Sequence, residues 1–203
     1  FWSELNEHLL GHIFERSLSD IVEIEKGEEA DLSERMSERK NFGIFYTTQV
    51  LTDYISSQVV DSFLEEASLD ADGSGSVEQA EADLEQKIQC LKELKVLDPA
   101  CGSGAFLVSS FRELHLRLRR LDQSLNSIRN RSAGPLLDQA EHFSNAEVLK
   151  NGFFGADLLP QAVEIAKLAL WLKTARRNET VADLSDNFFA GDSLRISDLE
   201  KAL

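Results

Sequence analysis

Apolar residues recur at helical spacing in two segments at the start of the chain. The first segment spans residues 2–24, and the second follows Thr47 and Thr48, which are good N-cap residues for a helix. The second segment has one helical stripe of apolar side chains, at Val50, Leu51, Tyr54, Ile55, Val59 and Phe63. Residues 25–40 between the two segments are charged and aperiodic, which predicts a loop.

Beyond residue 80 the pattern alternates between helix and strand. The predicted elements are a helix at 80–93, a strand at 95–98, a helix at 105–121, a strand at 152–157, a helix at 159–177 and a strand at 187–192. The polar residues 122–150 contain a Gly134-Pro135 turn, and the helix at 159–177 is apolar nearly all round, which predicts packing on both sides. Strands that alternate with helices predict a parallel sheet with right-handed crossovers, an α/β fold.

Each of the three predicted strands ends in an acidic residue. These residues are Asp98, Asp157 and Asp192. In a parallel α/β sheet, ligands bind at the carboxyl ends of the strands. The three carboxylates are therefore expected to lie at one ligand-binding edge.

Composition restricts the class of protein. The 203 residues carry a formal net charge of −15, which argues against a surface that binds a polyanion everywhere. An arginine cluster at 112, 117, 119, 120, 129 and 131 is better explained by solvated helix faces than by DNA contacts. Cys90 and Cys101 form neither a disulfide framework nor a metal-binding pattern, and His8 and His12 lack further ligands, so no metal site is expected. Without a transmembrane run or secretory signal, the expected location is the cytoplasm, and the oligomeric state stays open.

The glycine-rich loop DPACGSG after the first strand is compatible with more than one nucleotide ligand. A phosphate-binding P-loop needs GxxxxGK[ST], and no lysine follows Gly104. A dinucleotide fingerprint needs a third glycine, where this chain has Leu107, and the next strand-end acid lies far beyond the usual ~20 residues. NAD is therefore the weaker hypothesis but stays open.

A cationic ligand without phosphate fits the loop better. S-adenosylmethionine carries an ammonium and a sulfonium, which Asp98 and the carbonyls of the 99–102 turn would attract. Gly102 and Gly104 would let the backbone approach without Cβ clashes. Asp157 is placed to accept the ribose hydroxyls, and Asp192 to accept from the adenine amino group.

Four segments resemble N6-adenine DNA methyltransferases of bacterial restriction–modification systems, including fused, type IIG-like restriction–methylation proteins. VLDPACGSGAFL resembles their cofactor motif, and GFFGADLLPQAVEIAKLALWL and NFFAGDSL resemble the second and third motifs. Upstream, RKNFGIFYTTQVLTDYI is similar to their Gly-x-[Phe/Tyr]-Tyr-Thr-Pro segment, with Thr48 in place of proline. The resemblance covers about residues 39–65 and 95–195 and implies a partial Rossmann-like class I S-adenosylmethionine-dependent methyltransferase sheet with an N-terminal helical segment.

The resemblance also implies a role for each matching residue. Tyr46 and Thr47 would bind the methionine carboxylate, partly through main-chain N–H groups at the helix start. The residues around the methionine and sulfonium would be Asp98, Ala100, Gly102 and Gly104. Asp157 would hold the ribose, with Leu158 covering the adenine, and Asp192 would bind the adenine amino group beside Ser193. Cys101 is interpreted as a small packed residue, because the Pro-Cys nucleophile of cytosine-C5 methyltransferases is absent.

The expected function is the cofactor-binding part of an adenine-N6 DNA methyltransferase. The family's catalytic [Asn/Asp]-Pro-Pro-[Tyr/Phe] tetrapeptide is not found after Pro160, so it is expected beyond Leu203, as is the domain that would contact DNA. The expected division is an N-terminal helical segment at 1–66, a flexible linker at 67–79 and a partial methyltransferase domain at 80–203. A non-catalytic cofactor-binding module and an NAD-dependent oxidoreductase are the alternatives, and an RNA or protein acceptor stays open.

Overall fold

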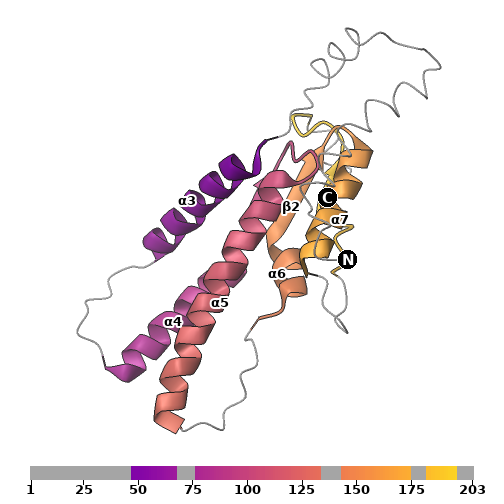
Figure 1. The fold of residues 1–203 in the computed structure, drawn as a ribbon. Coiled ribbons are helices and arrows are strands. Elements are labelled where there is room, and N and C mark those ends of the chain that lie inside the picture. Colours follow the sequence, from indigo (N-terminus) through magenta and orange to yellow (C-terminus); the bar gives the residue numbers. More distant parts are fainter. Residues whose placement is uncertain (1–46, 68–75, 134–142, 175–181, 196–203) are drawn as a thin grey trace, which may run out of the picture.

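A computed structural model of the chain describes residues 47–67, 76–133, 143–174 and 182–195. In order, the described elements are α3 (Gln49–Ala67), α4 (Val77–Glu93), β1 (Val96–Asp98), α5 (Ala105–Ala133), α6 (Asn145–Gly152), β2 (Phe153–Asp157), α7 (Pro160–Thr174) and β3 (Phe188–Ala190) (Figure 1). The predictions for the helix at 2–24, the loop at 25–40, Tyr46 and the Gly134-Pro135 turn lie outside the described residues. The predicted division into domains stays a prediction.

The three described strands form a parallel sheet. Their order is β1-β2-β3, with Val96 opposite Phe153 and Gly155 opposite Phe188. The chain passes through α5 and α6 between β1 and β2, and through α7 between β2 and β3. The predicted parallel α/β arrangement is thus confirmed, and Pro160 is the first residue of α7, where its missing N–H leaves no helical bond unmade.

The core lies where α5 and α7 pack on the sheet. Phe111 of α5 meets Phe153 of β2 edge to face, with ring centroids 5.6 Å apart. Leucines from several helices and from the segment before β3 pack around this pair. Those with almost no exposed surface are Leu91, Leu107, Leu114, Leu118, Leu149, Leu170 and Leu184. Each such side chain contributes about 1.5–3 kcal/mol through burial. On α7, Leu168 and Leu172 are exposed in the described part of the chain, so the prediction that this helix is packed on both sides is wrong along that stripe.

Helix α5 is longer than its sequence pattern predicts. It continues through the polar residues 122–133, and α6 begins in the remainder of the polar segment 122–150, in which the sequence predicted only the Gly134-Pro135 turn. The extension is held by tertiary contacts, because Leu125 is buried and Arg129 forms ion pairs with Glu81 and Glu85 of α4. Helix α4 also begins slightly earlier than predicted, at Val77, after Ser76 accepts a hydrogen bond from the backbone of Gln79 at 3.4 Å.

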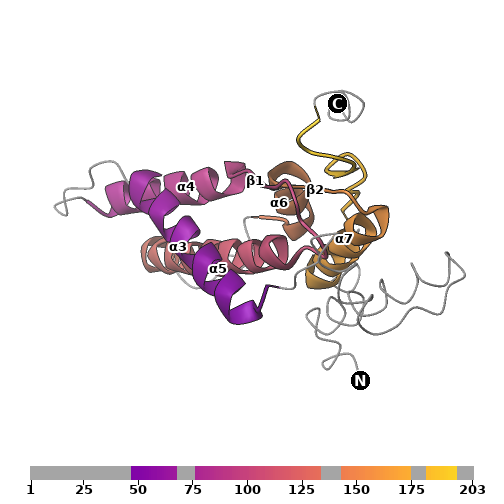
Figure 2. The same ribbon diagram turned by 90° about the horizontal axis from the view of Figure 1, so that it is seen from above.

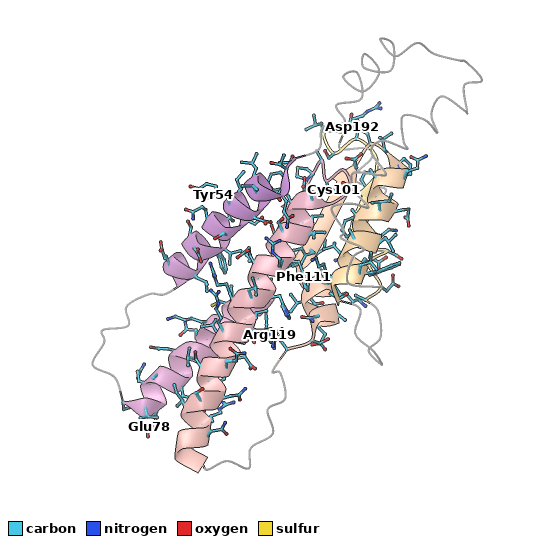
Figure 3. All side chains as sticks on the ribbon, in the orientation of Figure 1. Tyr54, Glu78, Cys101, Phe111, Arg119 and Asp192 are labelled. Atoms are coloured by element: carbon cyan, nitrogen blue, oxygen red, sulfur yellow. The ribbon has the colours of Figure 1, made fainter. Side chains whose placement is uncertain are left out.

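Most of the apolar stripe of α3 does not face the core, although Phe63 at its end packs against it. Val50, Tyr54 and Val59 are 81%, 64% and 62% exposed, and Tyr54 projects from the outer side of the helix (Figure 3). The buried face of α3 carries Thr52 and Ser56, which contact α5, and Val60, which belongs to the core. The spacing of apolar residues therefore does not identify the face by which most of this helix packs.

The helices α3, α4 and α5 lie beside one another and extend away from the sheet. In Figure 2, seen from above, they occupy one side, and β1, β2, α6 and α7 occupy the other. Among the described helices, none is both long and apolar enough to cross a bilayer.

Candidate functional site

The predicted strand-end acids lie at one edge of the sheet. Asp98 and Asp157 are the last residues of neighbouring parallel strands, and Asp192 follows the end of β3 by two residues. Adjacent strands lie about 4.8 Å apart, so the three carboxylates share this edge. Figure 3 labels Asp192 and Cys101 at the same end of the molecule. We call this set of strand ends, together with the loop 99–104, the strand-end site.

The loop after β1 is a tight turn anchored to β2. The backbone N–H of Ala100 donates to Asp98 Oδ1 at 3.1 Å, and that of Cys101 donates to the carbonyl of Ala156 at 2.8 Å. The N–H of Gly104 then bonds back to the carbonyl of Cys101 at 2.8 Å, directly before α5 begins. These bonds hold the loop over the end of the neighbouring strand.

Asp157 joins all three strand ends. Its Oδ2 accepts from the N–H of Gly102 at 2.8 Å, and its Oδ1 accepts from the N–H of Leu159 at 2.9 Å. Its carbonyl accepts from the N–H of Gly191, just beyond β3, at 2.8 Å. A carboxylate has about four acceptor positions, so each oxygen can still accept a hydroxyl from a ligand.

The turn after β3 is built in the same way around Asp192. The carboxylate of Asp192 accepts from the N–H of Leu194 at 3.0 Å, and its carbonyl accepts from the N–H of Arg195 at 3.0 Å. Ser193 is half-buried beside it. Leu158, at the end of β2, is 66% exposed and offers an apolar surface next to the two acidic groups.

The electrostatics of the site favour a cation. Burial is the main cause that raises the pKa of Asp98, and the nearby carboxylate of Asp157 raises it further, against the opposing hydrogen bond from Ala100. A positive group bound between these carboxylates would relieve their repulsion and favour the ionised form of Asp98. The site is therefore suited to an ammonium or sulfonium and poorly suited to a phosphate.

The two loop glycines have different surroundings. Both have positive φ, 52° at Gly102 and 85° at Gly104, a region that residues with a side chain rarely adopt. A Cβ on Gly104 would lie 2.9 Å from the Cβ of Ala166 in α7, whereas a Cβ on Gly102 would meet nothing within 4 Å. Gly104 therefore serves helix packing, and Gly102 leaves open space at the site.

Gly155 has a role that the sequence motifs do not reveal. A Cβ there would lie 2.6 Å from the Phe188 ring and 3.1 Å from Cys101 Sγ. The absent side chain thus lets Phe188 and the loop close over the middle strand. An isolated glycine inside a strand pattern, which often marks a close approach, was the signal available for it.

Thr47 lies two residues before the start of α3, at the same end of the molecule as the loop. Thr48 is the last residue before the helix, and its carbonyl accepts from the N–H groups of Leu51 and Thr52. Hydrogen bonds and ion pairs join Thr52 to Ser109 and Asp61 to Arg117, so α3 and α5 run parallel and begin at one end. Tyr46, which is predicted to bind the methionine carboxylate together with Thr47, lies outside the described residues.

Cys101 is packed in the turn and poorly placed for nucleophilic chemistry. Its thiol is buried, and burial together with the charges of Asp98 and Asp157 raises its pKa to about 12. At pH 8 only about one thiol in ten thousand would be ionised, and the thiolate is the reactive form.

We expect Ellman's reagent at pH 8 to label Cys90 at least about 100-fold faster than Cys101, because Cys90 is partly exposed whereas the Cys101 thiol is buried and its pKa is raised. The rates are measured by absorbance on Cys90→Ser and Cys101→Ser, each of which retains one cysteine. Urea should make the two variants equally reactive. Rapid labelling of folded Cys90→Ser would contradict the packed role of Cys101.

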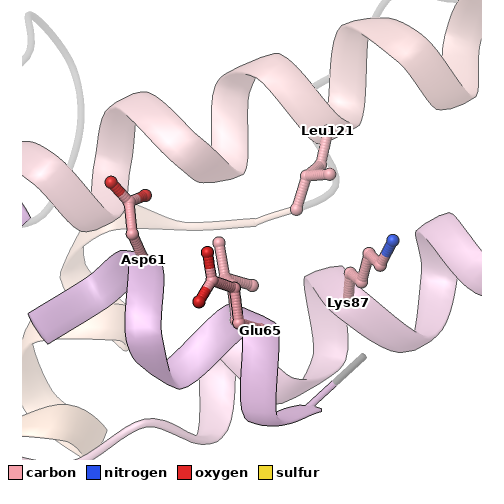
Figure 4. A pocket seen from close by; sticks show the side chains of 5 residues that line it. Asp61, Glu65, Lys87 and Leu121 are labelled. Atoms are coloured by element: carbon pink, nitrogen blue, oxygen red, sulfur yellow. The ribbon is translucent and has the colours of Figure 1, made fainter. Parts of the chain in front are cut away.

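A separate hollow lies among the helices, away from the strand ends. It is lined by Asp61, Leu64, Glu65, Lys87 and Leu121, from α3, α4 and α5 (Figure 4). None of the residues predicted from the sequence to bind a cofactor lines it. Among the residues that the structure describes, no group of histidine, cysteine and acidic side chains is arranged to hold a metal ion.

Comparison with known proteins gives a consistent result. Residues 74–198 match the family described as "MmeI, DNA-methyltransferase domain". A "putative type II restriction enzyme and methyltransferase" of Methanocaldococcus jannaschii is 26% identical over 187 residues, which cover 83% of this chain and 14% of that protein. DNA methyltransferase A of Bacillus subtilis is 30% identical over 96 residues, 47% of this chain and 10% of that protein. The chain thus spans a small part of the length of these relatives.

Proposed function

The chain belongs to the MmeI DNA-methyltransferase domain family, and from this premise we propose that it binds S-adenosylmethionine for the methylation of adenine N6 in DNA. The observation that carries the proposal is the set of hydrogen bonds made by Asp157. They connect Asp157 to Gly102 in the loop after β1, to Leu159 just after β2 and to Gly191 just after β3. We further propose that the described parallel sheet is part of a Rossmann-like class I methyltransferase domain.

The residues at the strand-end site fit this cofactor. Gly102 leaves open space above the loop, and two carboxylates with remaining acceptor positions lie beside it. Asp98 and the loop backbone from Ala100 to Gly104 would hold the ammonium and sulfonium, while Thr47 and Tyr46 would bind the methionine carboxylate at the start of α3. Two parallel helices that begin at this end would both present positive dipole ends to that carboxylate.

The nucleoside part of the cofactor would occupy the other half of the site. Asp157 would accept the ribose hydroxyls, and the exposed Leu158 would cover the adenine. Asp192, with Ser193 beside it, would accept from the adenine amino group. When bound, the cofactor supplies an electrophilic methyl group on its sulfonium, and the described residues orient it and neutralise its charge. The groups that would bind the target base are expected from the rest of the methyltransferase.

Calorimetric titration of the chain tests the cofactor. We expect a saturable 1:1 binding heat with S-adenosylmethionine and with S-adenosylhomocysteine. NAD should give no heat, because its pyrophosphate would face Asp98 and Asp157 in a loop without a lysine. The reverse pattern would support the oxidoreductase alternative instead.

A second candidate function is a non-catalytic cofactor-binding module, because the described residues of the strand-end site are all assigned to the cofactor and none of them to a target base. The full-length protein separates the two. Incubation with tritiated S-adenosylmethionine and unmethylated DNA, followed by nucleoside mass spectrometry, should give N6-methyladenine. Parallel reactions with RNA and with protein test the other acceptors, and absence of methyl transfer in every reaction would favour the module.

A further inference from the structure

We propose that a row of hydroxyl groups between α3 and α5 positions Thr47 against the strand-end site. The hydroxyl row consists of Thr52 and Ser56 on α3 and of Ser109 and Ser110 on α5. Thr52 Oγ1 lies 2.9 Å from Ser109 Oγ, and Ser56 Oγ lies 3.1 Å from Ser110 Oγ. The inference rests on the proposed cofactor function, because it assigns these residues to the half of the site that would hold the methionine carboxylate.

The row lies close to the functional end of both helices. Thr52 is in the first turn of α3, and Ser109 is one turn into α5, which begins at Ala105. Because the helices run parallel, this contact relates the backbone at Thr47 to the Gly102–Gly104 loop. The two segments are far apart in the sequence, so their relative position depends on the contacts between α3 and α5, and the Thr52–Ser109 bond lies near the functional end of that interface.

The row has a defined direction of hydrogen bonding. Ser109 Oγ donates to Asp53 Oδ1 at 2.7 Å, and the same carboxylate pairs with Arg112. A carboxylate can only accept, so the proton of Ser109 points to Asp53 and the Ser109 oxygen accepts from Thr52. The carbonyl of Gln49, in the first turn of the helix, is a second acceptor for the same Thr52 proton, 3.0 Å from Thr52 Oγ1. The Thr52 hydroxyl therefore lies between the backbone at the start of α3 and Ser109 of α5, and its one proton is shared between these two acceptors.

The remaining contacts of α3 do not define its register as closely. The apolar residues Val50, Tyr54 and Val59 are exposed in the described part of the chain. Val60, which is buried in the core, and Phe63, which packs against it, lie two turns or more beyond Thr52 and therefore further from the site. The second ion pair of the interface, between Arg117 and Asp61, lies more than two turns further from the site and is partly exposed. Thr52 and Ser109 have no exposed surface, so their bond forms away from competing water and requires one alignment of the two helices.

Two ligands distinguish positioning from general stability. S-adenosylmethionine carries the methionine carboxylate that Thr47 would bind, whereas 5′-methylthioadenosine retains only the nucleoside and a thioether. Thr52→Val removes the hydroxyl with little change in shape. We expect this substitution to weaken the binding of S-adenosylmethionine by about tenfold, which corresponds to the loss of about one hydrogen bond. Its affinity for methylthioadenosine should stay within about twofold of the wild type.

Companion variants control for the substitution itself. Ser109→Ala should reproduce the selective loss, and Thr52→Ser, which restores the hydroxyl, should recover S-adenosylmethionine affinity. Ser127→Ala removes an exposed hydroxyl that bonds within α5 far from the site, and it should bind both ligands like the wild type. Urea unfolding of each variant shows whether the fold is intact.

The outcomes separate the two proposals. A wild-type chain that binds neither ligand would overturn the cofactor function and this inference with it. A wild-type chain that binds both, with variants that either bind normally or lose both ligands equally, would overturn the inference alone. If Thr52→Val fails to fold, the affinities of Ser109→Ala for the same two ligands decide whether the hydroxyl row positions Thr47.

Discussion

Replacement of Asp157 by alanine is expected to weaken the binding of S-adenosylmethionine by at least about 100-fold. The carboxylate would accept two ribose hydroxyls, and hydrogen bonds to a charged group contribute about 1.5–3 kcal/mol each, where 1.4 kcal/mol is tenfold in affinity. The substitution also removes the acceptor for the N–H groups of Gly102 and Leu159, so the loop would lose its link to β2. Isothermal titration of both proteins under identical buffer conditions measures the loss.

A matched aspartate separates ligand binding from turn formation. Asp183 accepts the N–H of Ser185 at 3.0 Å, the same bond across two residues that Asp157 makes with Leu159, but it is exposed and precedes β3. Asp183→Ala should leave cofactor affinity within about twofold, in line with surface substitutions of about 0.5 kcal/mol. Unchanged affinity in a folded Asp157→Ala variant would contradict the ribose role.

The strands and their terminal acids could be predicted because the signals are local. β1 and β2 are short apolar runs that end in an aspartate, and β3 is followed by one two residues later; the alternation with helices restricts the topology to a parallel sheet. The positions of Asp98, Asp157 and Asp192 at one edge follow from that topology without knowledge of any side-chain contact. The bonds from Gly102 and Gly191 to Asp157 do not follow, because they depend on how the loops close.

The packing of the helices could not be predicted either, because it too depends on contacts between segments that are far apart in the sequence. On α3 the spacing of Val50, Tyr54 and Val59 indicates an apolar face, yet α5 contacts the opposite face through Thr52 and Ser56. Hydroxyl pairs between helices leave no periodic apolar signal. The second half of α5 was missed because its helical state depends on α4, whose carboxylates pair with Arg129. The arginine cluster thus contributes ion pairs between helices, a use that composition alone does not identify.

Replacement of Gly104 by alanine is expected to destabilise the protein by about 2–5 kcal/mol. A side chain at φ 85° costs roughly 1–2 kcal/mol, and overpacking a filled site typically costs about 1–3 kcal/mol more. The new Cβ would lie 2.9 Å from the Cβ and 3.1 Å from the Cα of Ala166, which has no exposed surface. Gly102→Ala is the matched control, because its φ is also positive but its Cβ meets nothing within 4 Å. It should lose only about 1–2 kcal/mol.

The contact itself can be isolated by a double-mutant cycle in urea unfolding. Ala166→Gly removes the methyl group that Gly104→Ala would strike, at a cost of about 1 kcal/mol for glycine in a helix. If the steric contact causes the loss, the decrease in unfolding free energy caused by Gly104→Ala should be at least about 1 kcal/mol smaller in the Ala166→Gly background than in the wild type. Gly102→Ala should cost the same in both backgrounds. Equal costs for Gly104→Ala in both backgrounds would instead assign its effect to backbone strain and to the Cα of residue 166, which stays 3.1 Å from the new Cβ after Ala166→Gly.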